Sequence, residues 1–374
     1  MYRWRDAAAT SESILFQTRF ALPAMKTSPK ISVLMPVYNV ATYVQEAIES
    51  IINQSYTDFE LLIINDGSTD TTRDKVLQFT DSRIRFIENE HNIGLANTLN
   101  RGIELAAGEY IARMDGDDIS LPDRLKRQVD ILDRHPDIDI CGAGYRFFGS
   151  KNYEVRYPQD HEAIKVGLLF GCCMIIPLFR KKSIVEAHLQ YEQEFFPAED
   201  YRFWTKCVMQ LKMYNIPETL FLYRMHATQV SETRTNQSQM SDKVRTLYLQ
   251  KLFPALSQQD TQLFISTFAE TKGISAINEV KAYDQCKQRI LQANMLHPTL
   301  NQKALHQILQ QHIVAKIRNF IVEEWFVERY TLNRYISLFS SGILFRLPLK
   351  FNIKLWIKVM LHKTAQPIPT SKLK

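Results

Sequence analysis

Short apolar runs alternate with helix-period segments from Ile31 to Gly116, and this alternation constrains the fold more than any other feature of the sequence. Strands and helices in strict alternation are typical of a parallel sheet that is covered on both faces. The pattern therefore predicts an α/β fold with a mostly parallel sheet and helices on both faces. We expect strands at residues 31–37, 59–64, 84–87 and 110–114, and helices at 43–54, 73–79, 95–107 and 124–132.

After these elements the expected α/β pattern continues and then gives way to helices. Strands are expected at 138–148 and, as a buried apolar strand, at 172–180, followed by a helix at 201–211. From about residue 238 to residue 330 the periodicity is helical throughout. We therefore expect an N-terminal extension at 1–30, an α/β domain at 31–235, a helical region at 236–328 and a basic amphipathic tail at 329–374.

Composition excludes several classes of protein. Hydrophobic residues make up 45% and charged residues 23% of the 374 positions, which is ordinary globular usage. The formal net charge of +6 is too small to indicate a nucleic-acid binder. The five cysteines contain no Cys-x-x-Cys pair, which disfavours a zinc knuckle or a disulfide framework and favours a reducing cytoplasmic location. The longest apolar run, Gly167 to Phe179, is shorter than the about 20 residues of a membrane span.

Three aspartates follow the strand expected at 110–114, in the sequence Asp115-Gly116-Asp117-Asp118. Ligands of parallel α/β sheets bind at the carboxyl ends of the strands, so acidic residues there are candidates for a site. Carboxylates this close together repel one another unless a cation or solvent relieves the repulsion. The motif suits a hard divalent ion, and the alternative is a solvated acidic turn.

Other acidic motifs have both a structural and a functional interpretation. The turn that contains Asp66 could only cap the following helix, or its carboxylate could accept hydrogen bonds from a base or ribose. The pair Glu199-Asp200 could complement a helix dipole or supply a general base. His226 is either an ordinary residue or a further metal ligand.

Nine short motifs follow one another along the chain. They are Pro36-Val-Tyr-Asn39, Asp58-Phe-Glu60, Asp66-Gly-Ser-Thr-Asp70, Asn92-Ile-Gly94, Ala107-Gly-Glu-Tyr110, Arg113-Met-Asp-Gly-Asp-Asp118, Arg124-Leu with Gln128, Glu199-Asp200 with Trp204, and Tyr223-Arg-Met-His226. Together they stand in the order found in family 2 glycosyltransferases, which the sequence resembles over about residues 31–232.

The resemblance implies a GT-A-like, Rossmann-type fold that binds a nucleotide-sugar donor, with uridine donors favoured. By this resemblance Asp66 would hold the nucleotide base, and Pro36, Tyr38 and Asn39 would line the same pocket. Asp115 would approach the ribose, or a metal through water.

The same resemblance implies a divalent metal, Mn²⁺ or Mg²⁺, at the donor diphosphate. Asp117 would ligate this metal, with Asp115, Asp118 and His226 as further members of the site. The metal would neutralise the charge that develops on the leaving diphosphate.

Catalysis is implied to be a single displacement with inversion at the anomeric carbon. Asp200 would take the proton from the acceptor hydroxyl, with Glu199 as its neighbour and possible substitute. The Gln-x-x-Arg-Trp motif and the membrane helices of processive synthases are missing, so transfer of single sugars is expected. The acceptor would be a glycan or a lipid-linked molecule in the synthesis of bacterial cell-surface polysaccharide.

Two alternatives remain at this point. One is a sugar nucleotidyltransferase, which would require a glycine-rich loop with a basic residue after the first strand, unlike Pro36-Val-Tyr-Asn39. The other is a non-catalytic, membrane-docked module that binds sugars.

The charge is unevenly distributed along the chain. Residues 1–328 carry a net charge of −3, while no acidic residue follows Glu328 and nine basic residues do. Arg346, Lys350, Lys354 and Lys358 recur every four residues among apolar ones. This spacing fits a helix on an anionic membrane, on the inner face of the plasma membrane, or a helix packed on the body. The alternation from Leu349 to Leu355 also permits a strand.

Overall fold

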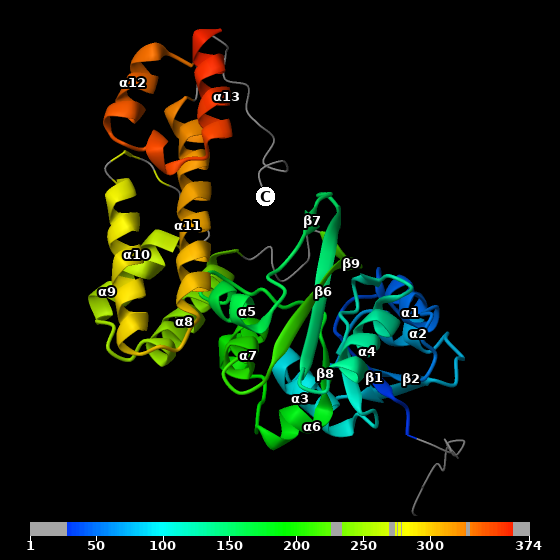
Figure 1. Cartoon of the computed structure of the whole chain (residues 1–374). Helices are drawn as coiled ribbons and strands as arrows, with labels where there is room; N and C mark the ends of the chain where they lie inside the picture. Colours follow the sequence, from blue (N-terminus) through cyan, green and yellow to red (C-terminus); the bar gives the residue numbers. More distant parts are fainter. Residues whose placement is uncertain are drawn as a thin grey trace, which may run out of the picture.

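The computed structural model describes residues 28–361, apart from 226–233, 269–273, 275, 278 and 327–329. Its centre is one mixed sheet in the order β3-β2-β1-β4-β8-β6-β9-β5, with β7 paired to β6 (Figure 1). The strands are β1 (Ile31–Val37), β2 (Phe59–Asn65), β3 (Ile84–Glu88), β4 (Tyr110–Arg113), β5 (Ile119–Ser120), β6 (Ile140–Gly149), β7 (Glu154–Val155), β8 (Leu178–Arg180) and β9 (Met213–Met225).

The expected α/β fold with helices on both faces is confirmed. Side chains alternate along β1, so that Val33 and Met35 point to one face and Leu34 to the other, and each face is covered by an apolar helix stripe. On the first face lie α1 (Val44–Ile52) and α4 (Arg124–Arg134); on the second lie α3 (Leu95–Leu105), α6 (Lys181–Glu186) and α7 (Glu199–Cys207). The short helices α2 (Thr72–Val76), α5 (His161–Gly167) and η1 (Gln193–Phe195) complete this part.

The sheet is parallel from β3 to β4 and mixed beyond β4, where β8 runs antiparallel to both β4 and β6. The strand expected at 172–180 is wrong over most of its length, since only β8 is a strand. The segment before it satisfies its carbonyls with side chains instead: Asn215 donates to the carbonyl of Cys173, and Gln128 to that of Ile176. Pro177 also lacks an amide hydrogen for a ladder.

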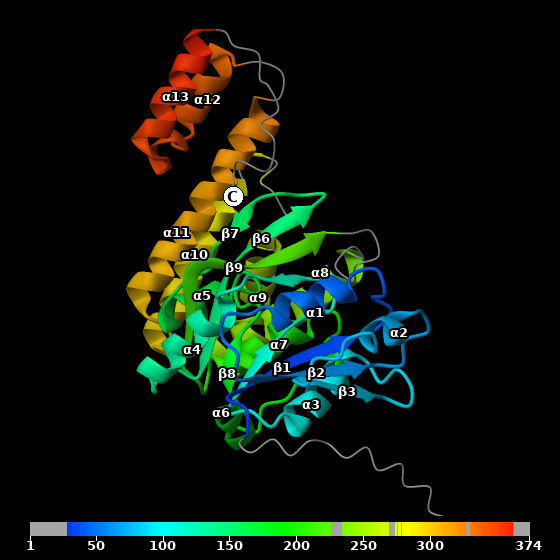
Figure 2. The same ribbon diagram turned by 90° about the vertical axis from the view of Figure 1, so that its right-hand side faces the viewer.

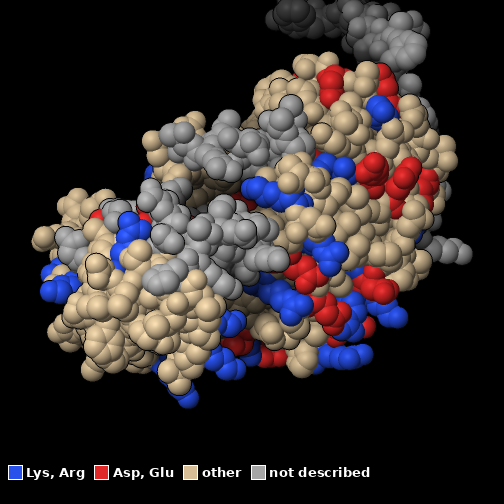
Figure 3. Space-filling model, turned by 90° about the horizontal axis from the view of Figure 1, so that it is seen from above, with Lys and Arg blue, Asp and Glu red and all other residues tan. Residues whose placement is uncertain are grey.

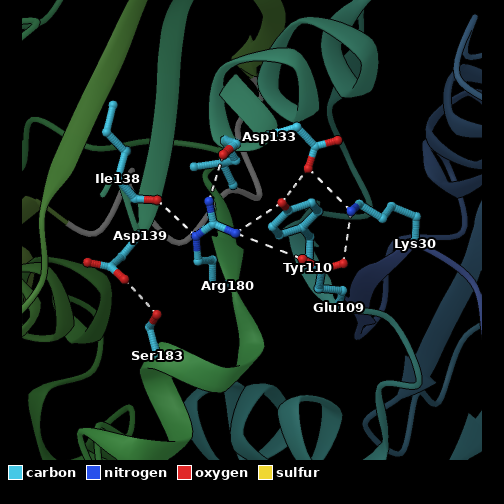
Figure 4. A network of polar contacts seen from close by, with 9 residues as sticks. Lys30, Glu109, Tyr110, Asp133, Ile138, Asp139, Arg180 and Ser183 are labelled. Atoms are coloured by element: carbon cyan, nitrogen blue, oxygen red, sulfur yellow. Dashed lines mark hydrogen bonds and ion pairs between the residues drawn. The ribbon is translucent and has the colours of Figure 1, made fainter. Parts of the chain in front are cut away.

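A polar network joins the parallel part of the sheet to β8 (Figure 4). The guanidinium of Arg180 donates to the hydroxyl of Tyr110 at 3.0 Å and to the carbonyls of Ile138 and Leu132 at 3.0 and 2.6 Å. The hydroxyl of Tyr110 in turn donates to Asp133 at 2.6 Å. Because Tyr110 and Arg180 are partners across β4 and β8, these bonds fix the register at which the sheet changes direction.

The helical region that follows packs beside α5 and α7 of the body (Figures 1 and 2). Arg245 donates to the carbonyls of Leu169 and Phe170, and the ring of Phe170 stacks on His312 at 3.7 Å. The predicted helical character is confirmed. The helices are α8 (Arg234–Leu252), α9 (Gln258–Phe268), α10 (Glu279–Leu296), α11 (Gln302–Asn319) and η3 (Phe320–Trp325), which continues α11.

The last described elements are α12 (Leu332–Ser340), η4 (Leu344–Arg346) and α13 (Leu349–Met360). The alternating stretch from Leu349 to Leu355 is therefore a helix, and the strand alternative is wrong. In the part of the chain that the structure describes, no helix has the length and apolar character needed to span a membrane. The expected N-terminal extension lies outside the described residues up to position 27.

Replacing Arg180 by leucine tests the network at the junction. The variant leaves two buried carbonyls and the Tyr110 hydroxyl without their donor, so the free energy of unfolding should fall by about 2–4 kcal/mol in urea denaturation. Lys182→Leu is the matched control, since this side chain is 82% exposed and forms only a surface pair with Glu186. Equal losses in the two variants would contradict the structural role of Arg180.

Candidate active site

A cavity of about 510 Å³ opens at the carboxyl edge of the parallel strands. The ends of β1, β2 and β4 contribute one side, and the start of α7 and the loop before β8 contribute the other. Eight of the ten residues predicted for the site line it: Pro36, Tyr38, Asp66, Asp115, Asp117, Asp118, Glu199 and Asp200. Asn39 does not line it, and His226 lies outside the described residues.

The three aspartates after β4 differ in their surroundings. Asp115 and Asp117 are partly exposed in the cavity, whereas Asp118 is buried. Burial, together with repulsion from Asp117 and Asp115, raises the pKa of Asp118 well above its ordinary value. The loop of residues 115–118, here called the acidic loop, therefore presents two carboxylates to the cavity and keeps a third one beneath them.

Arg224 at the end of β9 holds the acidic loop in place. Its backbone amide donates to Oδ1 of Asp118 and its Nε donates to the carbonyl of Asp117, both at 2.7 Å. Its guanidinium lies over the rings of Tyr43 and Phe148 and pairs with a glutamate of α1, Glu46, at 2.5 Å. The end of β9 is thereby positioned directly beside the acidic loop.

The carboxylate of Asp66 is buried and organises the loop before α3. It accepts hydrogen bonds from Nδ2 of Asn89 at 2.6 Å and from the amides of Ile93 and Gly94 at 2.9 and 3.0 Å. Its acidity at the end of a strand thus has a structural reason that the sequence did not reveal. Gly94 adopts φ +89°, and a Cβ there would lie 2.5 Å from the side chain of Gln193. The loop therefore closes tightly over one wall of the cavity.

The loop after β1 is fixed by Asn39 rather than left open to a ligand. Oδ1 of Asn39 accepts hydrogen bonds from the backbone amides of Thr69 and Asp70, and the backbone amide of Asn39 donates to the hydroxyl of Ser68. This residue adopts φ +52°, a conformation that asparagine tolerates better than most residues. Tyr38, beside it, is 47% exposed at the cavity.

Glu199 and Asp200 begin α7 but face different surroundings. Glu199 is 4% exposed, and within the described part of the chain its Oε2 has no hydrogen-bond partner. Burial and repulsion from Asp200 raise the pKa of Glu199 to about 7. The side chain of Asp200 is 34% exposed, and burial among neighbouring atoms also raises its pKa. Asp200 is therefore the member of the pair that a substrate can reach.

The two oxygens of Asp200 are held unequally. Oδ1 accepts a hydrogen bond from the amide of Tyr201 at 2.6 Å. Oδ2 has longer contacts, 3.9 Å to Sγ of Cys172 and 4.0 Å to Nη1 of Arg113. Oδ2 is therefore the less constrained of the two oxygens.

Arg113 is a member of the site to which the sequence assigned no role. Its guanidinium lies 3.3 Å from Asp115 on one side and 4.0 Å from Asp200 on the other. Burial alone would lower the pKa of Arg113, but Asp115, Asp200 and Glu199 hold it above its ordinary value. Arg113 is the first residue of the motif that ends at Asp118, but its residue type and place in the sequence do not reveal this role. Only the structure shows that it lies between two carboxylates.

One wall of the cavity is apolar and irregular. It consists of Met174, Ile175, Ile176 and Pro177 together with Phe196 and Pro197. Two buried side chains of α4 fix its backbone: Arg124 donates to the carbonyl of Ile176 at 3.2 Å and Gln128 to the same oxygen at 3.0 Å. Arg124 also donates to the carbonyl of Arg113 at 2.5 Å.

The carboxylates of the site outnumber the cations beside them, so a divalent cation would relieve part of their repulsion. The aspartates after β4 adjoin three guanidinium groups, those of Arg113, Arg124 and Arg224, and Arg113 is shared with Glu199 and Asp200. Oxygen ligands of this kind suit Mg²⁺ or Mn²⁺. No cluster of three or more His, Cys, Asp or Glu side chains is arranged to enclose a metal among the described residues. A metal would thus need ligands from a bound substrate or from residues outside that part.

Comparison with known proteins finds relatives of this chain. The model of the family "Glycosyl transferase family 2" matches residues 32–196. An uncharacterized glycosyltransferase of Haemophilus influenzae is 32% identical over 252 residues, which cover 61% of this chain and 77% of the relative. An uncharacterized glycosyltransferase of Rickettsia typhi is 31% identical over 240 residues, covering 60% and 73%.

Solved structures support the fold. Residues 1–349 of TarS from S. aureus align with a TM-score of 0.52 and 16% identity, covering 78% of this chain and 86% of that one. The same fragment in complex with UDP-GlcNAc also gives a TM-score of 0.52, with 80% and 94% covered.

Stability should depend on pH through Glu199. Its pKa is higher in the folded chain than in the unfolded chain, so its ionisation destabilises the fold as the pH rises from 5 to 8. Asp200 and Asp115 add to this cost and Arg113 offsets part of it. In the Glu199→Gln variant this side chain cannot ionise. The free energy of unfolding of the variant minus that of wild type should therefore increase by about 1–3 kcal/mol between pH 5 and pH 8.

Denaturant titrations at both pH values measure this difference. Glu194→Gln is the control, because this side chain is 70% exposed and its variant should track the wild type at both pH values. A Glu199→Gln curve parallel to that of wild type would show that Glu199 does not carry the effect.

Proposed function

Because the chain belongs to glycosyltransferase family 2, we propose that it transfers a single sugar from a nucleotide-sugar donor to a hydroxyl group of a glycan or lipid-linked acceptor. The proposal includes a divalent metal and inversion at the anomeric carbon. One observation carries it: the acidic loop and the partly exposed carboxylate of Asp200 line a single cavity at the carboxyl edge of the sheet, with the guanidinium of Arg113 between Asp115 and Asp200.

The donor is proposed to occupy the side formed by β1, β2 and β4. Tyr38 offers an exposed ring at the mouth for stacking on a base, and Pro36 lines the wall behind it. Asp66 lines the same region, where its remaining acceptor capacity could bind a base or ribose. A uridine donor is the first choice, and a structural neighbour has been crystallised with UDP-GlcNAc. Asn39 would act indirectly, by holding the loop that carries Tyr38.

Asp117 and Asp115 are proposed to hold Mn²⁺ or Mg²⁺ together with the donor diphosphate. Asp118 would support the metal site from beneath by holding the loop, since its Oδ1 already accepts the amide of Arg224. His226 follows β9, whose end is bonded to the acidic loop, and is retained as a proposed ligand. When bound, the metal supplies positive charge to the leaving diphosphate.

Asp200 is proposed as the general base. An acceptor hydroxyl is a weak nucleophile at neutral pH, so a positioned carboxylate that removes its proton accelerates attack. The raised pKa of Asp200 makes this carboxylate a stronger base than a solvated aspartate. Glu199 lies behind it and would influence it through charge rather than by contact with the substrate.

The acceptor is proposed to lie against the apolar wall from Met174 to Pro177. Such a wall suits the apolar face of a sugar ring or the proximal part of a lipid carrier. We place the reaction in the cytoplasm, in the synthesis of a bacterial cell-surface polysaccharide. The division into an extension at 1–30, a catalytic domain at 31–235, a helical region at 236–328 and a basic tail at 329–374 belongs to the same proposal.

Asp117→Ala should abolish metal-stimulated release of nucleoside diphosphate, because the variant loses a carboxylate that faces the diphosphate. The assay is a panel of UDP- and GDP-sugars with Mn²⁺ or Mg²⁺, read as free nucleoside diphosphate. Asp74→Asn, an exposed acidic residue on α2 that does not line the cavity, is the control and should keep full activity. Absence of both turnover and thermal stabilisation with every donor would refute the proposal.

Asp200→Asn should separate catalysis from donor binding. The neutral amide keeps the size of the side chain but cannot take a proton, so kcat should fall by about 10²–10⁴-fold. The thermal shift caused by a nucleoside diphosphate with metal should stay that of wild type, since Asp200 lies on the acceptor side. A kcat near the wild-type value would assign the base to another residue.

A further inference from the structure

Exposed apolar side chains are concentrated at the end of the described chain. Residues 330–361 form the terminal hairpin, which comprises α12, η4 and α13. Of the sixteen large hydrophobic side chains that are exposed in the described part, ten lie in this hairpin. A globular body rarely leaves so many apolar groups in solvent on one short segment, so the hairpin has the character of an interaction surface.

The helix α13 has three distinct faces. Leu355 and Val359 are buried and attach the helix to the protein. Leu349, Ile353 and Ile357 recur at helical spacing on a second face and are 74%, 50% and 48% exposed.

The third face of α13 is basic. Lys350 and Lys354 each follow an exposed apolar residue by one position, which places them about 100° around the helix from it. Both lysines are exposed, and neither forms an ion pair with a described residue. The helix therefore presents an apolar strip bordered by positive charge, the pattern of helices that lie in the membrane interface.

The apolar surface continues onto α12 and η4. The rings of Tyr335 and Trp356 lie 4.9 Å apart, and those of Phe339 and Phe345 lie 5.3 Å apart. Ile336 and Phe339, on the same side of α12, are 53% and 54% exposed. The two helices thus form one surface rather than two separate strips.

This surface is held in a fixed position at the far end of the molecule. Arg346 forms an ion pair with Asp284 of α10 at 2.5 Å, and the guanidinium of Arg318 on α11 lies 5.2 Å from the ring of Phe351. Figures 1 and 2 show the hairpin projecting beyond the α/β body, on the side away from the parallel strands. Viewed along that direction, its end is mainly free of charged groups, with Lys and Arg at the rim (Figure 3).

Charge determines which partner fits. Residues 330–361 contain five basic residues and no acidic one. A second copy of the chain on this surface would bring Lys350 and Lys354 toward cations of the same sign, which is unfavourable. An anionic lipid surface accepts the apolar strip and attracts the lysines at its border.

We propose that the terminal hairpin docks the protein on an anionic membrane, with the exposed face of α13 in the interface and Lys350 and Lys354 at the headgroups. This docking goes beyond sugar transfer and does not depend on it. It assigns a binding surface to the chain whatever donor and acceptor it uses.

Vesicle co-sedimentation of the full chain tests the docking, without donor or acceptor. Vesicles of mixed phosphatidylcholine and phosphatidylglycerol should bind the protein, and pure phosphatidylcholine vesicles should bind it far less. Lys350→Gln with Lys354→Gln should lower the partition coefficient by about 25-fold, about fivefold per lysine. The control is Lys126→Gln with Lys182→Gln, two exposed lysines on the body, which should leave binding unchanged.

A second pair of variants tests the apolar strip. Ile353→Ser with Ile357→Ser should reduce binding at least about tenfold. Met295→Ser with Leu296→Ser is the control, since these side chains are 70% and 67% exposed at the end of α10. All four substituted apolar side chains are exposed, and unchanged thermal unfolding would verify that each variant is folded.

Three results would overturn the docking. One is equal binding to neutral and anionic vesicles, and another is equal loss in the test and control variants. The third is absence of vesicle binding together with self-association that the Ile353→Ser and Ile357→Ser pair abolishes in sedimentation velocity, which would assign the surface to a second copy. Donor turnover is measured separately, so failure here leaves the proposed transfer reaction standing.

Discussion

The cavity depends on one buried cation, the guanidinium of Arg124. This side chain has no exposed surface, and its Nη2 group donates to the carbonyls of both Arg113 and Ile176. Arg113 ends the strand that leads into the acidic loop, and Ile176 belongs to the apolar wall, so one side chain ties this loop to that wall. Burial lowers the pKa of Arg124 to about 9, and Asp115 and Asp118 counter this shift. Asp115 and Asp118 thus help to keep the guanidinium of Arg124 charged, and this guanidinium in turn holds the strand end that leads into the acidic loop.

Much of the fold followed from the sequence because the strands and helices between Ile31 and Arg134 have strong, uninterrupted periodicity. The predicted first strand coincides with β1, and the following elements agree within a few residues. The segment from Cys172 to Pro177 shows why apolar character alone misleads. Its backbone is satisfied by side chains from α4 and β9, which are distant in sequence and carry no signal in the segment itself. Only tertiary contacts distinguish such a loop from a buried strand.

Site residues could be predicted where an acidic residue follows the expected end of a strand or begins a helix. They were missed where their role depends on contacts with residues distant in sequence. Asp115, Asp117, Asp66 and Asp200 all line the cavity. The structure shows that Asp66 accepts hydrogen bonds from the amides of Ile93 and Gly94 and that Arg113 lies between Asp115 and Asp200. Apart from the pair of Arg113 with Asp115, these contacts join residues that are distant in sequence, so the sequence alone could not predict them. The assigned roles of the carboxylates remain predictions, as does the contribution of His226.

The helix α11 connects the two ends of the molecule. Next to its start, the backbone amide of Asn301 donates to Glu162 on α5 of the α/β body, and near its end Arg318 packs on Phe351 of α13. Its 18 residues span about 27 Å. With the hairpin seated on a bilayer, this rod would act as a spacer that sets the height of the cavity above the lipid. Acceptors would then be selected by reach as well as by chemistry, since only a hydroxyl carried at that height could meet Asp200.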